Sequence, residues 1–304
     1  MIHPNFKEYL PSYYFSTINP HAAYPKLEGR LKTETCVIGG GLTGLCTALP
    51  LAENGREVTV LEAARIGFGA SGRSGGQVIS DYACGMEEIE KQVGLEQARW
   101  FWQQSLQAVE LVDERVKKHQ IACDWQRGYA TVAIRPQHWE ELQQWHEHAR
   151  QHYGATHYQL WDKATLKQQL ASDMYLGAQF DPHSGHLHPL NYTLGIARAA
   201  TEAGAQIFEQ SPMTRIEPYQ GGWLVHTSDG SIECQNLVYA VNTYAGLHQK
   251  FKPLEKKAIA VSTFIIATEP LGERAKELIR NNMAICDNRH VLDYYRLSAD
   301  GRLL

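Results

Sequence analysis

The chain has 304 residues, 43% of them hydrophobic and 20% charged, and its formal net charge is −4. A length of this order favours about two domains of roughly 150 residues each. The mildly acidic balance, without a lysine-rich tract, argues against nucleic acid and against an anionic membrane surface as partners. No apolar stretch reaches the ~20 residues of a membrane-spanning helix, so we predict no membrane partner.

The N-terminal residues and the cysteines both favour a cytoplasmic protein. Residues 1–30 contain prolines and scattered charges but neither the basic start nor the apolar core of a secretory signal, so we predict an irregular lead-in. The six cysteines are spread singly along the chain, and none belongs to a CxxC pair. Free thiols in a reducing compartment are the expected state.

The first regular elements predicted are a strand, a tight turn, a helix and a second strand. Residues 35–38 form a short apolar run that ends in glycines, and apolar residues at helical spacing follow from 42 to 52. Residues 57–62 have the pattern of a second buried strand. Pro50 lies inside the predicted helix, where it lacks an N–H donor, so we expect a bend there.

The rest of the chain alternates between helical and strand patterns. Helices are predicted at 86–119, 136–153, 162–170 and 189–202, and strands at 129–134, 205–208, 222–227, 231–234, 237–241 and 257–268. A hairpin is predicted where 292–297 faces 302–304 across the Asp300-Gly301 turn. Helices that alternate with strands favour an α/β fold.

The glycines after the first strand have the spacing of a dinucleotide-binding turn. In Gly39-x-Gly41-x-x-Gly44, the first glycine permits the turn, the second lets a pyrophosphate approach the backbone, and the third lets helix and strand pack closely. The helix that begins with Leu42 and Thr43 offers unpaired N–H groups and a partial positive charge to the phosphates. A glycine-rich turn that only packs is the alternative interpretation.

Glu62 supports the dinucleotide interpretation because it ends the second predicted strand. A carboxylate at that place can accept hydrogen bonds from both hydroxyls of an adenosine ribose. The same carboxylate repels a 2′-phosphate, which argues against NADP. The strand, the glycines, the helix and the acid therefore occur in the order that a dinucleotide site requires.

A second glycine-rich loop distinguishes FAD from NAD. It supplies a hydroxyl at Ser71, a cation at Arg73 and positions without side chains at Gly75 and Gly76. Such a loop suits an extended cofactor from its phosphates to its flavin ring. An NAD dehydrogenase usually continues directly into another βα unit.

The two glycine-rich motifs together resemble the FAD-dependent amine and amino-acid oxidase (DAO-type) superfamily. The resemblance is carried by residues 37–44, by Leu61-Glu62-Ala63 and by residues 66–77, whose last residue, Gln77, joins the expected cofactor-binding set. It implies FAD as the cofactor and a Rossmann-like FAD-binding domain of the glutathione-reductase type beside an α+β substrate domain. The expected FAD-binding domain comprises residues 31–85 and 189–250, and the substrate domain comprises residues 86–188 and 251–304.

Three further segments resemble the members of this superfamily that oxidise gamma-glutamylputrescine: residues 12–14, 185–191 and 292–300. The resemblance implies a primary or secondary amine as substrate. Hydride then passes from the amine carbon to the flavin, the imine hydrolyses to an aldehyde, and oxygen reoxidises the flavin with release of hydrogen peroxide. Because the flavin performs the chemistry, no catalytic side chain is expected.

Two alternatives to this function stay open. One is a glycine- or sarcosine-type amino-acid oxidase. The other is a truncated, non-catalytic fragment, because in the resembling family the strand at 302–304 continues into a C-terminal section that covers the flavin. On that view we expect a chain that ends at Leu304 to be catalytically impaired.

Tyr294 and Arg296 are the candidate substrate contacts. Both lie on one face of the last predicted strand, with Tyr295 on the other. An aromatic ring and a guanidinium side by side can receive an ammonium and a distant carboxylate. The alternative is a packed tyrosine and a solvated arginine.

The histidines raise the question of a metal site. His183, His186 and His188 lie close together, and His148 and His152 have i,i+4 spacing on a predicted helix. No cysteine partner or HExxH pattern accompanies them, so we predict no metal. By the resemblance, His186 and His188 pack where the chain crosses between domains.

Overall fold

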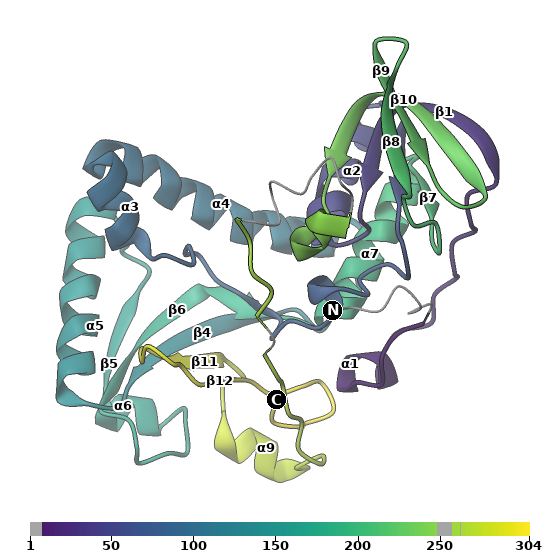
Figure 1. Ribbon diagram of the computed structural model, residues 1–304. Coiled ribbons are helices and arrows are strands. Elements are labelled where there is room, and N and C mark those ends of the chain that lie inside the picture. Colours follow the sequence, from purple (N-terminus) through teal and green to yellow (C-terminus); the bar gives the residue numbers. More distant parts are fainter. Residues whose placement is uncertain (1–7, 248–256, 262) are drawn as a thin grey trace. The chain divides into compact units, whose positions relative to one another are not determined.

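The computed structural model describes residues 8–247, 257–261 and 263–304. The chain divides into two compact units. Unit 1 comprises residues 1–74, 121–123 and 189–264, and unit 2 comprises residues 75–120, 124–188 and 265–304. Each unit has a sheet of its own (Figure 1).

Unit 1 is built on a six-stranded sheet. Its strands, in spatial order, are β7 (Gln206–Phe208), β2 (Val58–Leu61), β1 (Gly29–Ile38), β10 (Gly230–Tyr239), β9 (Gly222–His226) and β8 (Arg215–Tyr219). Strands β7, β2, β1 and β10 are parallel, whereas β9 and β8 are added antiparallel. The carboxyl ends of β1 and β2 therefore meet at one edge of the sheet, and this edge carries both the glycine turn and Glu62.

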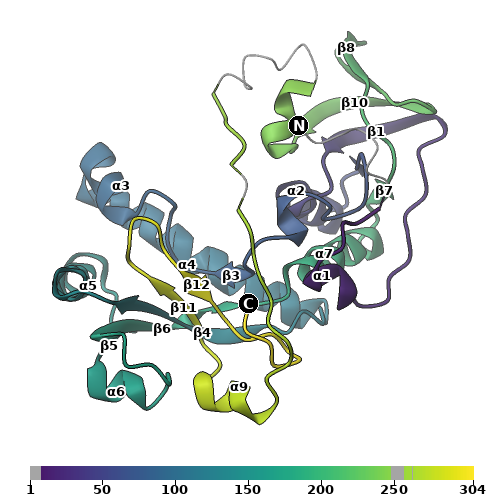
Figure 2. The same ribbon diagram turned by 60° about the horizontal axis from the view of Figure 1, so that its bottom comes forward.

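The helices of unit 1 connect these strands. They are α1 (Tyr13–Ser16), α2 (Leu42–Glu53), the short 3₁₀ helices η1 (Ala70–Gly72) and η3 (Asn242–Leu247), and α7 (Pro189–Glu202). Helices α2 and α7 lie side by side in both views (Figures 1 and 2). Helix α2 buries Leu45, Ala48, Leu49 and Ala52, whose spacing gives it one apolar face. The helix continues through Pro50 into its last turn.

Unit 2 is built on a second sheet, with the strand order β12-β11-β4-β6-β3 and with β5 paired to β6. The strands are β3 (Gln77–Val78), β4 (Gln126–Ala133), β5 (Gln159–Asp162), β6 (Gly177–His186), β11 (Ala284–Asp287) and β12 (Tyr294–Tyr295). The helices are α3 (Met86–Val93), α4 (Leu95–Lys118), α5 (Pro136–His148), the π-helical turn η2 (Ala149–Tyr153), α6 (Lys163–Lys167) and α9 (Glu273–Leu278). Figure 2 shows α4 on one side of this sheet and α6 and α9 on the other.

Most of the predicted elements are confirmed. The helix at 189–202 has the predicted bounds, and the strand–turn–helix–strand unit is β1, α2 and β2. The predicted helix at 86–119 is two helices, because Gly94 between them has φ +81°. The two short strands at 231–241 form the single strand β10. The predicted hairpin is present, since Arg296 and Leu304 exchange backbone hydrogen bonds of 3.2 and 2.9 Å.

The predicted strand at 257–268 is wrong for the residues that the structure describes. Residues 257–261 and 263–268 have no strand assignment. The side chains of Ile259, Phe264 and Ile266 are 84%, 90% and 83% exposed. Their apolar pattern is typical of a strand, but a strand also needs a hydrogen-bonded neighbour along its length. Within the described part of this segment, only the last residue, Thr268, has a backbone partner, since its N–H donates to Leu303 O at 3.0 Å.

The unit boundaries differ from the expected domain boundaries. The first boundary falls between Ser74 and Gly75 instead of after residue 85, and the last falls between Phe264 and Ile265 instead of after residue 250. Unit 1 also contains residues 121–123 and the lead-in, whose described residues 8–30 are irregular except for α1 and for Gly29 and Arg30, which begin β1. Within the described part of the chain, no helix is both long and apolar enough to cross a membrane.

Candidate functional site

The glycine turn connects β1 to α2 in unit 1. Gly39 has φ +112°, and a Cβ atom on it would collide with the carbonyl oxygen of Ala240. A Cβ on Gly44 would collide with the carbonyl oxygen of Gly39 and lie 3.1 Å from Val37 Cγ1. These contacts agree with the roles predicted for the first and third glycines, which are a sharp turn and close packing of helix on strand.

Gly41 differs from Gly39 and Gly44 because packing does not explain why this residue is a glycine. It is the N-cap of α2, with extended backbone angles of φ −90° and ψ −176° that any residue can adopt. A Cβ there would approach only Ser71, at 2.8 Å from Oγ. The Ser71 hydroxyl accepts a hydrogen bond from Leu42 N at 3.0 Å, and Thr43 in the same first turn is exposed. Apart from residues next to it in the chain and helix, only Ser71 lies within 4 Å of the place that a Cβ on Gly41 would take.

Glu62 lies beside this turn because it follows β2, whose last residue Leu61 pairs with Ile38. Its Oε2 accepts from Gly40 N at 2.8 Å, and its Oε1 accepts from Ala64 N at 2.8 Å. Burial raises the pKa of the Glu62 carboxyl, and the two backbone N–H groups oppose this effect. The carboxylate is thus held at the carboxyl edge of the parallel strands, next to the glycines.

The loop after Glu62 contributes Ser71 and Arg73 to unit 1. Arg73 is exposed, its Nε donates to Gly69 O at 3.2 Å, and its guanidinium lies over the Phe68 ring at 5.5 Å. The ring and the carbonyl hold the cation in one place while leaving it accessible.

Gly75 and Gly76 belong to unit 2. A Cβ on Gly75 would be 2.5 Å from Tyr294 Cε2, and its carbonyl oxygen accepts from Arg296 Nε at 2.8 Å. Gly76 has φ +72°, and its carbonyl accepts from Leu187 N at 2.8 Å. Both glycines are therefore fixed by neighbours within their own unit.

Gln77 is the first residue of β3 and pairs with His186 of β6. Its side-chain Nε2 donates to Ile285 O at 3.2 Å. The amide thus connects two strands of the unit 2 sheet.

The predicted alternation from Tyr294 to Arg296, over β12 and the residue after it, is confirmed. Tyr294 and Arg296 both contact Gly75, whereas the Tyr295 hydroxyl lies on the other side, 2.8 Å from that of Tyr175. Arg296 is only 4% exposed, so the alternative of a solvated arginine is wrong. Its Nη1 also donates to Leu297 O at 3.2 Å.

Comparison with known proteins decides the family. Residues 34–304 match the family model DAO, FAD dependent oxidoreductase. The chain belongs to the DAO family of FAD-dependent oxidoreductases. This DAO-family chain is 45% identical to the probable oxidoreductase OrdL of Haemophilus influenzae, covering 100% of the chain and 71% of that protein. It is 39% identical to gamma-glutamylputrescine oxidoreductase of Escherichia coli, covering 98% of the chain and 69% of that protein.

Solved structures agree with the fold of the DAO-family chain. Glycine oxidase from Geobacillus kaustophilus superposes with a TM-score of 0.68 at 17% identity, over 90% of this chain and 70% of that one. L-proline dehydrogenase from P. horikoshii has a TM-score of 0.68 at 22% identity, over 90% and 69% of the two chains. The α/β fold predicted from the sequence is therefore confirmed, and the DAO-family protein is an enzyme with FAD as its cofactor.

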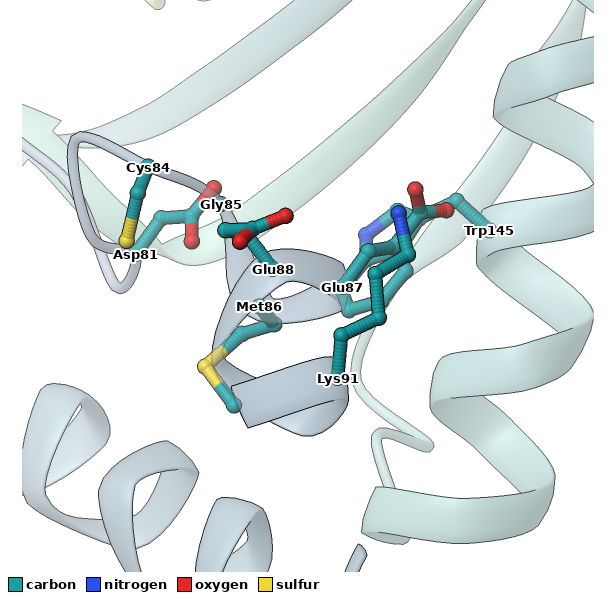
Figure 3. A pocket seen from close by; sticks show the side chains of 8 residues that line it. All are labelled: Asp81, Cys84, Gly85, Met86, Glu87, Glu88, Lys91 and Trp145. Carbon is teal, nitrogen blue, oxygen red and sulfur yellow. The ribbon is translucent and has the colours of Figure 1, made fainter. Parts of the chain in front are cut away.

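One cavity of the DAO-family protein lies in unit 2, apart from every predicted site residue. It has a volume of about 330 Å³ and is lined by Asp81, Cys84, Gly85, Met86, Glu87, Glu88, Lys91 and Trp145. Figure 3 shows these side chains on α3, on the loop before it and on α5. No residue of either glycine-rich motif lines it.

The histidines are held by other side chains or by burial. His148 Nε2 lies 2.8 Å from Glu90 Oε2, and His183 Nδ1 lies 3.3 Å from Glu110 Oε1. Among the described residues, no three His, Cys, Asp or Glu side chains are arranged to hold a metal ion. His186 and His188 are 2% and 4% exposed, and His186 Nε2 is 2.8 Å from Asn282 O.

Because His186 and His188 are buried, we expect the protein to lose stability in mild acid. Burial lowers the pKa of His186 and of His188 to about 4, and the charge of Arg296 acts in the same direction. Unfolded histidines titrate near 6.5, so protons favour the unfolded chain below that pH. Their contribution is fully present above pH 6.5 and falls by up to about 1.4 kcal/mol per pH unit per histidine as the pH drops toward 4.

Urea unfolding between pH 7 and pH 4.5 measures this slope. His186→Gln combined with His188→Gln should flatten it, because amides do not titrate in this range. His183→Gln, at a half-exposed side chain, controls for the loss of a histidine that is not buried. An identical slope in the double variant and the unaltered protein would contradict the assignment.

The sequence analysis did not identify two residues that hold the loop beginning at Ile66 in unit 1. Glu209, which follows β7, accepts from Ile66 N at 2.8 Å, and the Tyr9 hydroxyl donates to Ile66 O at 2.7 Å. Neither residue lies in a motif, and contacts across 143 and 57 residues leave no local signal in a single sequence.

Proposed function

We propose that FAD binds with its nucleotide half at the glycine turn of unit 1. The residues that would hold it are Gly39, Gly41, Leu42, Thr43, Gly44, Glu62, Ser71 and Arg73. The open space at Gly41 fits a pyrophosphate, since only Ser71 would be near a Cβ at that position. The Glu62 carboxylate beside Gly40 fits the ribose hydroxyls.

We extend the same proposal to Gly75, Gly76 and Gln77, which follow Ser71 and Arg73 directly in the chain. When bound, FAD supplies the acceptor for the electrons that leave the amine carbon. The residues of this chain have the tasks of binding the cofactor, orienting the amine and excluding water.

We further propose that the substrate is a primary or secondary amine, best represented by gamma-glutamylputrescine, with oxygen as acceptor and hydrogen peroxide as product. The observation that carries this proposal is the 39% identity to gamma-glutamylputrescine oxidoreductase across 98% of the chain. Tyr294, which is 37% exposed, is the proposed contact for the ammonium, and Arg296 is the proposed source of positive charge for the carboxylate.

The test is peroxide formation by the FAD-reconstituted protein with four amines: gamma-glutamylputrescine, putrescine, glycine and sarcosine. We expect the highest kcat/KM with gamma-glutamylputrescine. A preference for glycine or sarcosine would replace the proposal by an amino-acid oxidase. Flavin reduction by gamma-glutamylputrescine without peroxide formation would retain the substrate and refute oxygen as acceptor.

Arg296→Lys tests the carboxylate contact within this proposal. Lysine keeps the charge but loses the planar fork that binds a carboxylate in two places. We expect KM for gamma-glutamylputrescine to rise about tenfold, equivalent to about 1.4 kcal/mol, while KM for putrescine, which has no carboxylate, changes little. An equal rise for both amines would mean that Arg296 acts only by fixing Gly75.

A further inference from the structure

Glu209 is a buried carboxylate that the glycine motifs do not use. It follows β7 and is 2% exposed. Its Oε1 accepts from Ile66 N at 2.8 Å. Its Oε2 accepts from Arg65 Nη1 at 2.9 Å and from Tyr24 N at 3.2 Å. A carboxylate that has left water and receives three donors, one of them charged, is strongly fixed in position.

The backbone of Ile66 is held on both sides. Its N–H donates to Glu209, and its carbonyl accepts from the Tyr9 hydroxyl at 2.7 Å. Burial raises the pKa of the Tyr9 phenol far above its ordinary value, so the hydroxyl keeps its proton and stays a donor. Glu209 and Tyr9 are 143 and 57 residues away from Ile66 in sequence, so they fix Ile66 independently of the loop that it begins.

Ile66 in turn is packed against the glycine turn. Its side chain is fully buried, and a Cβ on Gly40 would be 2.5 Å from Ile66 Cδ1. The next residue, Gly67, donates its N–H to Gly40 O at 3.0 Å. The same loop then presents the Ser71 hydroxyl to Leu42 N. A shift at Ile66 would therefore move the wall of the space in front of Gly41.

We propose that Glu209 is a positioning residue for FAD binding. By fixing Ile66 and Arg65, it holds the loop at 66–72 against the glycine turn in the geometry that the pyrophosphate requires. This inference rests on the FAD site proposed for unit 1. It adds a residue that touches neither the expected phosphate position nor the ribose acid.

The N-terminal lead-in takes part in this arrangement. Arg65 bridges Glu209 to Glu8, with 2.7 Å between Arg65 Nη2 and Glu8 Oε1. Tyr9 and Tyr24 also belong to the lead-in, whereas the match to the family model begins at residue 34. Helix α1 of the lead-in contacts α7 in unit 1, and Figure 2 shows the two helices close together. The lead-in therefore supplies part of the support for the loop.

Glu209→Gln in the full chain tests the proposal. The amide keeps one acceptor but places an N–H₂ group where the carboxylate received donors from Arg65 and Tyr24. We expect Kd for FAD to rise at least about tenfold, and Kd for ADP, which represents the nucleotide half alone, to rise in parallel. Glu202→Gln is the matched control, because Glu202 pairs with Arg198 at 2.8 Å on the exposed face of α7 and should leave both constants unchanged.

Tyr9→Phe is the second variant, and it removes only the hydroxyl on the other side of Ile66. We expect weaker binding of FAD and ADP here too, and a non-additive effect when it is combined with Glu209→Gln, because both act through one residue. Thermal unfolding of the apoproteins distinguishes an effect on the position of the loop from an effect on the stability of the fold. A lowered Tm with unchanged Kd for FAD and ADP in both variants would reduce Glu209 to a structural role and overturn the inference.

Failure of the FAD site itself gives a different result. If the unaltered chain binds neither FAD nor ADP, or if Gly41→Val binds both as tightly as the unaltered chain, the proposed site is wrong and this inference falls with it. If Gly41→Val loses both ligands while Glu209→Gln and Tyr9→Phe retain them, the site stands and only the role of Glu209 is refuted.

Discussion

Gly41→Val is expected to lose FAD while keeping its fold. The residue has extended backbone angles, so valine meets no backbone strain there. Its Cβ would approach only the Ser71 side chain, which can rotate away. The two methyl groups would then fill the space that the pyrophosphate needs. We expect Kd for FAD to rise by at least about a hundredfold, equivalent to about 2.7 kcal/mol.

Titration of FAD fluorescence and the absorbance of the bound flavin measure this loss. Gly41→Ala serves as a graded control, because a single methyl group should give an intermediate Kd. Circular dichroism and urea unfolding of the apoprotein should show a native fold for both variants. If Gly41→Val retains a normal bound-flavin spectrum, the phosphates of FAD do not bind at this turn.

The strand–turn–helix–strand unit that carries the proposed nucleotide site was predictable because its determinants are local. Gly39, Gly41, Gly44 and Glu62 lie within or directly after one strand–turn–helix–strand unit, and their pattern is visible in residues close together in sequence. Residue types at fixed spacing are therefore enough to locate the turn. The sequence alone does not separate the packing glycines from the open one, because that difference depends on Ala240 and Ser71.

The parts that escaped prediction depend on distant partners. Strands β6 and β11 are recognised in the structure by pairing with β4, and β6 begins with Gly177 and includes Pro182, which weaken a strand pattern. Residues 257–261 and 263–268 show the opposite error, a strand pattern in which only Thr268 has a backbone partner, at Leu303. Apolar alternation indicates that a segment is able to form a strand. Only the fold shows whether a neighbouring strand is present to pair with it.

The same reasoning explains why the sequence predicts the face on which Arg296 lies but does not predict its burial. Alternation over β12 and the residue after it determines the face, since side chains in extended chain point to opposite sides with a period of two. Burial depends on Gly75, which lies 221 residues away and offers its carbonyl to the guanidinium. A single sequence carries no signal for that contact.

Gly44→Ala is expected to destabilise the protein, although glycine to alanine in a helix normally stabilises it by about 1 kcal/mol. Gly44 lies in the first turn of α2 and is buried. A Cβ there would collide with the carbonyl oxygen of Gly39, which is backbone and is itself held by the turn at φ +112°. Either α2 must move away from β1 or the turn must deform. Overpacking against such a rigid neighbour costs about 3 kcal/mol, so the sign of the usual effect is reversed.

Urea unfolding of the apoprotein measures this cost without any contribution from FAD. Thr47→Ala, at a half-buried position on the same helix, is the control and should change the free energy of unfolding by less than about 1 kcal/mol. Gly44→Ala should lower the urea midpoint and also weaken FAD binding, because the displaced helix carries the N–H groups of its first turn. A stabilised Gly44→Ala variant would show that the helix is not pressed against the turn, and the close packing assigned to the third glycine would then be wrong.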